Sequence, residues 1–184
     1  MKPIHKACGR DNLRPAQMYF RVKDGFIWAT NSHIVIKLPA SEVFGDDVIL
    51  SDEVLYFEAA AWDKCKFQNT KSISRDGLVF TTERGKEITA ITPDVWDEKY
   101  KYSFPNMENF LEPIPQKKLQ PIQTVSFSPL LMADLCASFA GHSSGYSFYF
   151  YGGNFDPIVV KHCDSEGWGV IMPIFPTRCE PTPF

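Results

Sequence analysis

Side chains able to carry acid–base chemistry are scattered along this sequence. Ser32 and His33 are adjacent, but neighbours on a strand point to opposite faces, so they do not form a nucleophile–base pair. His5, His142 and His162 have no acidic neighbour at a suggestive spacing. These positions therefore predict structural or solvent-facing histidines.

The five cysteines are widely spaced, and none of them forms a Cys-x-x-Cys pair. This spacing gives no signal for a zinc site or for a dithiol redox site. We expect free, mostly buried thiols in a reducing compartment. The five are Cys8, Cys65, Cys136, Cys163 and Cys179.

Several motifs that mark cofactor or metal chemistry do not occur. The sequence has no phosphate-binding Gly-x₄-Gly-Lys-Ser/Thr, no His-Glu-x-x-His and no acidic cluster for a metal. We therefore expect a non-catalytic protein that needs no metal and no cofactor. A small hydrolase with an unfamiliar site is the remaining enzymatic alternative.

The composition predicts a globular protein inside the cell. The 184 residues are 44% hydrophobic and 22% charged, and they can bury one large core or two small ones. The net charge of −3 means that any nucleic acid must be held by a local basic patch. No apolar run reaches the roughly 18–20 residues that span a bilayer, so we expect a cytoplasmic protein without a membrane partner.

The N-terminal part reads as strands joined by tight turns. Residues 17–22 and 26–30 flank Asp24-Gly25, a strong signal for a two-residue hairpin. A third strand, 33–38, ends at Pro39. Before these strands, residues 4–10 form only a short helix candidate.

Two later blocks repeat one order of elements. In the first, Ser51 caps a predicted helix over 52–66, and strands at 72–74, 78–81 and 87–91 follow. In the second, a strand at 122–127 precedes Ser128-Pro129, which begins a helix over 129–140. The strands that follow are predicted at 146–151, 157–162 and 169–175.

The repeat indicates an α+β fold in which both helices lie on one side of a continuous antiparallel sheet. Residues 93–121, rich in proline and aromatic side chains, are predicted as a linker laid across the surface. We place one domain at 1–115 and a half-domain at 116–184.

Three segments, in order, resemble motifs of the bacterial DNA polymerase III β subunit, the sliding clamp. Residues 29–36, Ala-Thr-Asn-Ser-His-Ile-Val-Ile, are similar to that family's Ala-Thr-Asp-Gly-His-Arg-Leu-Ala. Residues 104–107, Phe-Pro-Asn-Met, resemble its Phe-Pro-Asp-Tyr, and 170–174, Val-Ile-Met-Pro-Ile, resemble its Val-Val-Met-Pro-Met. Asn31, Ser32 and Ile34 replace the family's aspartate, glycine and arginine.

The resemblance implies a DNA clamp fold, with helices inside a ring and sheets outside. It also implies a peptide-binding pocket between two domains, which captures a short motif of a polymerase or another DNA-processing protein. A cleft with a methionine suits varied apolar peptides. Carried over by position, the pocket residues are Thr30, Ser32, His33, Ile34, Pro105, Val170, Met172, Pro173 and Ile174.

Double-stranded DNA and further copies of the chain are the other partners that the resemblance implies. The residues expected to face DNA are Lys6, Arg10, Lys64, Lys66 and Lys71. We expect a homo-oligomer formed by pairing of edge strands. Two hypotheses remain open, a processivity clamp that encloses DNA and a clamp-fold adaptor that binds proteins only.

Overall fold

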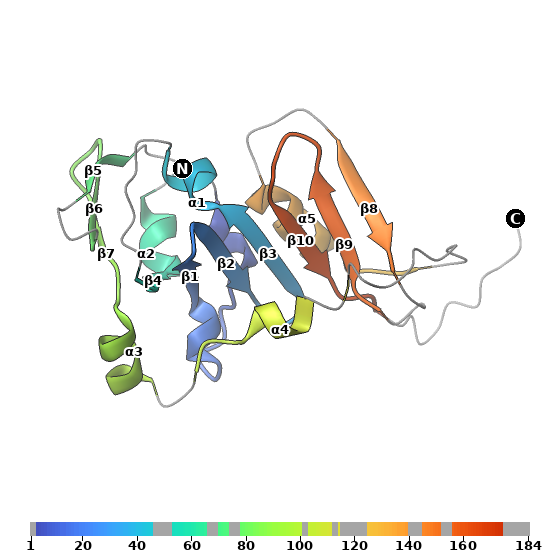
Figure 1. The fold of residues 1–184 in the computed structure, drawn as a ribbon, viewed down its shortest axis with the longest axis horizontal. Helices are drawn as coiled ribbons and strands as arrows, with labels where there is room; N and C mark the ends of the chain where they lie inside the picture. The colour runs from blue at the N-terminus through green and yellow to red at the C-terminus, as the bar shows by residue number, and fades with distance from the viewer. Residues whose placement is uncertain are drawn as a thin grey trace, which may run out of the picture.

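A computed structural model of the chain describes residues 3–45, 53–65, 70–73, 78–100, 103–111, 114, 125–139, 145–151 and 156–174. Its centre is a seven-stranded antiparallel sheet of order β4-β1-β2-β3-β10-β9-β8 (Figure 1). Those strands are β1 Tyr19–Lys23, β2 Phe26–Thr30, β3 Ile34–Pro39, β4 Leu55–Glu58, β8 Tyr146–Phe150, β9 Ile158–His162 and β10 Trp168–Ile171. A smaller sheet holds β5 Thr70–Ile73, β6 Val79–Thr82 and β7 Glu87–Thr89.

The β1–β2 hairpin forms as the sequence predicts. Asp24 (φ 51°) and Gly25 (φ 75°) both adopt the left-handed conformation that a tight two-residue turn of this hand requires. The predicted continuous antiparallel sheet is confirmed for seven strands, whereas the strands predicted at 72–74, 78–81 and 87–91 belong to the smaller, separate sheet. Its central step pairs β3 with β10, with Ile34 opposite Ile171 and Val35 opposite Val170. This pairing joins strands that lie on either side of the domain boundary predicted at residue 115.

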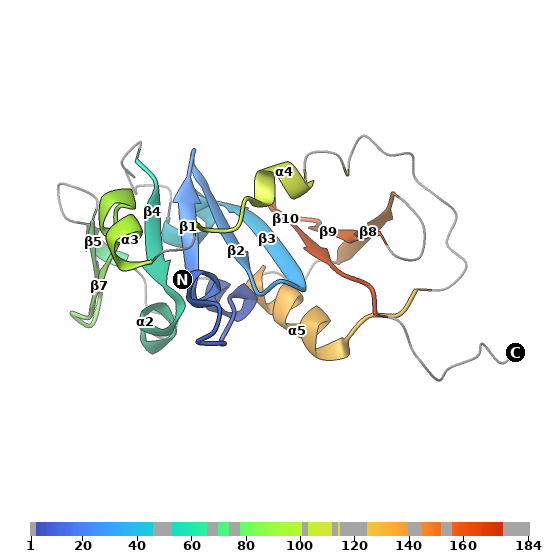
Figure 2. The same ribbon diagram turned by 90° about the horizontal axis from the view of Figure 1, so that it is seen from below.

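One side of the large sheet, here called the helix-covered face, packs against η1 (Ile4–Ala7), α2 (Ala59–Lys64) and α5 (Pro129–Ser138) (Figure 2). Its core includes Phe20, Phe57 and Leu135, each with no exposed surface. A Cβ on Gly169 would lie 2.6 Å from Leu135 Cδ1 and 2.9 Å from the Val35 carbonyl, so glycine lets α5 approach β10. The prediction that the two helices share one side of the sheet is confirmed for α2 and α5.

The opposite side, here called the aromatic face, is covered by α3 (Pro93–Lys99) and α4 (Met107–Leu111). Trp96 of α3 stacks on Tyr56 at 4.2 Å and meets Tyr19 edge-on at 5.1 Å. Figure 2 shows α4 and α5 on opposite sides of the sheet. The remaining short helices are η2 (Pro15–Met18) and α1 (Ala40–Phe44).

The prediction of one helix over 52–66 is wrong. Residues 55–58 form β4, which pairs with β1, and α2 begins only at Ala59. Leu55 and Phe57 point to one face of the sheet and Tyr56 to the other, and apolar side chains on both faces suit a buried strand. Glu58 precedes the helix and makes no side-chain cap, and Ser51 lies outside the described residues.

Three further boundaries differ from the sequence-based expectations. The surface linker at 93–121 contains α3 and α4, whose Trp96 and Met107 are buried. In the strand expected at 122–127, residues 125–127 are irregular and 122–124 lie outside the described residues. The strand expected at 169–175 ends at Ile171. Among the described residues, no helix is long and apolar enough to cross a bilayer.

Candidate functional site

The turn between β2 and β3 is held by side chains of the first motif. The Thr30 hydroxyl donates to the Ile34 carbonyl at 2.8 Å and accepts from the Ser32 amide at 3.1 Å. The Asn31 side-chain oxygen accepts from the amides of His33 and Ile34, each at 3.0 Å. An aspartate would offer the same acceptor oxygen, so the change to Asn31 preserves the turn.

Ser32 takes the position that the motif gives to glycine, and it does so at φ 76°. A non-glycine residue in this region costs on the order of 1 kcal/mol. Two side chains meet its hydroxyl oxygen, with Arg14 Nη1 at 2.9 Å and Gln17 Nε2 at 2.5 Å. These bonds connect the turn to the segment before β1, a link that the sequence pattern did not predict.

The third motif runs directly beside this turn. The Met172 amide donates to the His33 carbonyl at 2.9 Å, and the Ile174 amide donates to the Ser126 carbonyl at 2.8 Å. Met172 and Pro173 are half-buried, and Ile174 is 44% exposed. The structure therefore brings together two segments that are far apart in the sequence.

The other predicted pocket residues divide between core and surface. Ile34 and Val170 are each 1% exposed, and they belong to the helix-covered and the aromatic face respectively. Thr30 is buried, whereas Ser32 and His33 are exposed. Pro105 is half-buried and follows Phe104, which shares an apolar cluster with Val170. The predicted pocket residues with exposed or half-buried side chains are thus Ser32, whose hydroxyl is already bonded by Arg14 and Gln17, and His33, Pro105, Met172, Pro173 and Ile174.

A polar cleft of about 460 Å³ lies beside the turn between β2 and β3, and Asn31 and His33 of that turn line it. Basic side chains of Lys6, Arg10 and Arg14 line it, together with the acids Asp11 and Asp134. Arg14 was not among the predicted DNA-facing residues, although its spacing from Arg10 was visible in the sequence. The remaining lining residues are Cys8, Gly9 and Gln17.

The other predicted DNA-facing residues do not extend this basic group within the described chain. Lys64 is exposed on α2 and lies next to Asp63, which pairs with His5 at 3.2 Å. Burial lowers the pKa of His5, and Asp63 opposes that shift only in part. Lys66 lies outside the described residues, and only the backbone of Lys71, in β5, is described. α5 carries no basic side chain and one acid, Asp134.

The described residues contain no cluster of histidine, cysteine or acidic side chains that could hold a metal. Burial raises the pKa of the Cys8 and Cys65 thiols, which disfavours the reactive thiolate. Cys8, Cys65, Cys136 and Cys163 are free, as the sequence predicts, but only the first two are buried, since Cys136 is half-buried and Cys163 is exposed. Cys179 lies outside the described residues.

One short segment matches a catalytic motif and could argue against the expectation of a non-catalytic protein. Residues 141–145 read Gly-His-Ser-Ser-Gly, which fits the Gly-x-Ser-x-Gly pattern of serine hydrolases. In those enzymes the serine follows a strand and precedes a helix. Here the segment follows α5 and precedes β8, the reverse order, so its context does not support a nucleophile elbow.

Comparison with solved structures identifies the fold. The DNA polymerase III β subunit of Thermotoga maritima superposes with a TM-score of 0.54 at 9% sequence identity, covering 94% of this chain and 62% of that chain. The DNA polymerase sliding clamp of Pseudomonas aeruginosa gives a TM-score of 0.46 at 8% identity, covering 95% of this chain and 66% of that one. No family model and no curated protein matches the sequence.

The present chain thus spans less than two thirds of the length of the Thermotoga maritima subunit. Of the two superpositions, only that one exceeds a TM-score of 0.5, and at 9% identity it concerns the fold alone. The antiparallel sheet, with α2 and α5 on one side, agrees with the likeness. The chain therefore has the fold of the DNA polymerase III β subunit, the sliding clamp fold.

Proposed function

We propose that this protein is a non-catalytic, clamp-like scaffold that binds a short peptide of a DNA-processing partner. The docking surface comprises His33, Pro105, Met172, Pro173 and Ile174. Apolar side chains of the last three offer contact area, and the polar turn beside them can fix a peptide main chain. Peptides captured this way gain affinity mainly from a few well-packed apolar anchors.

The proposal rests above all on the hydrogen bond between the Met172 amide and the His33 carbonyl. Two of the three clamp-like segments meet there although nothing in the local sequence requires it. Apolar side chains reach the surface where the two segments meet: Ile174 is 44% exposed and Met172 is half-buried. Neighbouring apolar side chains that reach the surface beside polar groups are the composition expected of a peptide-docking surface.

Met172→Asp tests the docking surface. We expect it to abolish binding of a fluorescent clamp-binding-motif peptide, measured by anisotropy, because a carboxylate replaces the apolar anchor. Thermal melting reports whether the fold survives. Ile174→Asp is the second variant, since a charge at this more exposed side chain costs the fold less.

Met132→Asp is the matched control, because Met132 is also half-buried but lies on α5. It should bind the peptide like the unaltered protein. Wild-type-like peptide binding by a folded Ile174→Asp variant would contradict the proposal. So would equal losses in the Met132 and Met172 variants.

We further propose that copies of the chain associate through β8. This strand is an edge of the large sheet and reads Tyr-Ser-Phe-Tyr-Phe, without a charge to block pairing. The opposite edge strand, β4, already exchanges two backbone hydrogen bonds with Ile91, at 2.9 and 2.8 Å. Of these two edges, β8 is therefore the better template for another strand.

Light scattering measures this association. We expect a mass that is a multiple of 20.9 kDa, reduced to the single-chain value by Phe148→Lys, since Phe148 on β8 is 41% exposed. Phe110→Lys, on α4, is the control for adding charge to an exposed phenylalanine. A single-chain mass at high concentration in the unaltered protein would refute the proposal.

A second candidate function is an adaptor that binds no DNA. It is favoured by α5, which presents the exposed Leu130 and the half-buried Asp134 without a basic residue on the side where a clamp would meet phosphates. The clamp alternative draws on Lys6, Arg10 and Arg14 around the polar cleft. Duplex DNA binding that weakens with salt and with Arg10→Gln supports the clamp, whereas no binding at low salt supports the adaptor.

A further inference from the structure

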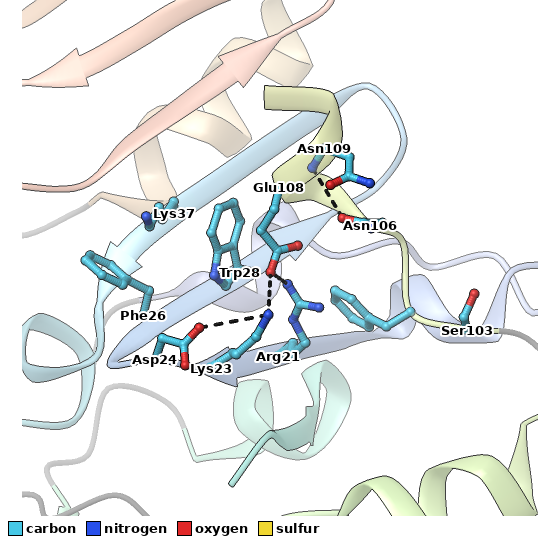
Figure 3. A pocket seen from close by; sticks show the side chains of 11 residues that line it. Arg21, Lys23, Asp24, Phe26, Trp28, Lys37, Ser103, Asn106, Glu108 and Asn109 are labelled. Atoms are coloured by element: carbon cyan, nitrogen blue, oxygen red, sulfur yellow. Dashed lines mark hydrogen bonds and ion pairs between the residues drawn. The ribbon is translucent and has the colours of Figure 1, made fainter. Parts of the chain in front are cut away.

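A second cleft, of about 640 Å³, lies on the aromatic face between the β1–β2 hairpin and α4 (Figure 3). None of the residues of the docking surface proposed above lines it, although Phe104 and Asn106, on either side of Pro105, do. Charged, aromatic and neutral polar side chains contribute to its walls. They are Arg21, Lys23, Asp24, Phe26, Trp28, Lys37, Ser103, Phe104, Asn106, Glu108 and Asn109.

Lys37 is the cation in this cleft without an acidic partner among the described residues. Its ammonium lies 3.9 Å from the centroid of the Phe26 ring and 4.9 Å from that of Trp28. Ring faces attract a cation but accept no conventional hydrogen bond, so the three N–H donors of Lys37 are not used by them. The aromatic contacts therefore position the charge without neutralising it.

Arg21 adds a second, more buried donor. Its side chain is 10% exposed, and its Nη2 donates to Glu108 Oε1 at 2.5 Å. The Arg21 Nε is buried and has no hydrogen-bond partner in the described structure. The bond to Glu108 therefore leaves part of the hydrogen-bonding capacity of Arg21 unused.

The charges of the cleft do not cancel. Glu108 is shared, because Lys23 Nζ also lies 3.4 Å from its Oε1, and the exposed Asp24 is 3.9 Å from Lys23. Three cations thus face two carboxylates, which leaves one positive charge in the cleft. A single excess charge, located mainly at Lys37, matches a monoanionic group.

We propose that this cleft binds a carboxylate side chain of an acidic peptide segment from a partner protein. Lys37 provides the ion pair, and Arg21, which also lines the cleft, adds positive potential behind it. Ser103, Asn106 and Asn109 line the cleft on the α4 side and can pair with the peptide main chain. A volume of about 640 Å³ is too large for an isolated ion and suits several atoms of a short segment.

Nucleic acid, another source of monoanions, fits the cleft less well. Single-stranded nucleic acid binds through open aromatic surfaces on which bases stack. Trp28 and Phe104 are each only 6% exposed, and Lys37 occupies the face of Phe26. The aromatic side chains are therefore committed to holding cations and offer no free stacking surface.

Fluorescence anisotropy with a labelled peptide of alternating glutamate and glycine tests the proposal in the full chain. We expect saturable binding, absent for the corresponding glutamine–glycine peptide. Lys37→Gln should weaken it about tenfold, because a charge-assisted contact is lost. Lys37→Arg, which keeps the charge on the aromatic faces, should retain binding.

Lys161→Gln is the matched control. Lys161 is exposed on β9. In the sheet, Trp168 of β10 lies between Lys37 and Lys161 and is paired with both, but Lys161 does not line the cleft. It should leave the peptide affinity unchanged. Equal weakening by both glutamine variants, no saturation by the unaltered protein, or tighter Lys37-dependent binding of oligothymidylate than of the peptide would each overturn the proposal.

Discussion

The two faces of the large sheet bury different chemistry. On the helix-covered face, Phe20 and Phe57 stack at 5.2 Å, and Gly169 lets α5 lie close to the strands. On the aromatic face, the guanidinium carbon of the buried Arg21 lies 5.2 Å from the centroid of the Phe104 ring and 6.0 Å from that of Trp28. The clustered side chains of the helix-covered face pack against one another, whereas rings of the aromatic face, including Phe26 and Trp28, hold the Lys37 cation against them. The first face therefore stabilises the fold, and the second can also bind a ligand.

The largest expected effect is in the core of the helix-covered face. Phe57→Ala should lower the free energy of unfolding by about 3–5 kcal/mol, because Phe57 is fully buried and the lost ring leaves a cavity. Urea denaturation measures the loss. Phe110→Ala, the same substitution at a side chain 47% exposed on α4, should change stability by less than about 1 kcal/mol. Similar losses in both variants would contradict the assignment of the main core to this face.

A smaller effect is expected on the aromatic face. Arg21→Met should cost about 2 kcal/mol, because it leaves the partly buried Glu108 carboxylate with only the more distant Lys23 ammonium. Replacing Glu108 by Leu in the same protein should restore part of the loss. If the double variant is as unstable as the sum of the two single variants, Arg21 and Glu108 are not coupled.

The pH dependence of stability provides a second measure of this pair. Burial alone would raise the pKa of Glu108, but the hydrogen bond from Arg21 and the charges of Arg21 and Lys23 outweigh it and hold that pKa below its ordinary value. The stabilisation is therefore present at pH values above the ordinary pKa of glutamate and is lost as the pH falls through the lower pKa of the folded state. Arg21→Met should remove most of this acid-sensitive component in urea titrations at several pH values.

The smallest expected effect concerns two turns, one near each cleft. Ser32, in the turn beside the polar cleft, has a φ of 76°, and Asp24, in the turn beside the cleft on the aromatic face, has a φ of 51°. Ser32→Gly should stabilise the chain by about 0.5 kcal/mol, since glycine relieves the backbone strain while only exposed hydrogen bonds from Arg14 and Gln17 are lost. Asp24→Gly should gain less, because aspartate tolerates this region better than serine. Thermal melting would contradict this expectation if Ser32→Gly lowered the melting temperature.

Local sequence was enough to predict the elements whose signals are unambiguous. Asp24-Gly25 predicts the β1–β2 turn, and Ser128-Pro129 predicts the start of α5, where the Ser128 hydroxyl accepts from the Leu131 amide at 3.4 Å. The helix predicted over 52–66 failed where it included 55–58. Nothing in the local sequence reports that β1 supplies a partner for this apolar stretch. Once that partner is present, tertiary pairing outweighs helix propensity.

For the candidate sites, the sequence by itself determined the turn of Thr30 and Asn31, because their hydrogen bonds span only a few residues. It also indicated which segments resemble the clamp. Only the tertiary structure decided that Met172 meets His33, that Ile34 and Val170 are buried on opposite faces, and that Arg21 reaches Glu108. Contacts of this kind depend on β3 pairing with β10 and on α4 folding back over β1 and β2, and neither arrangement follows from residues close in sequence.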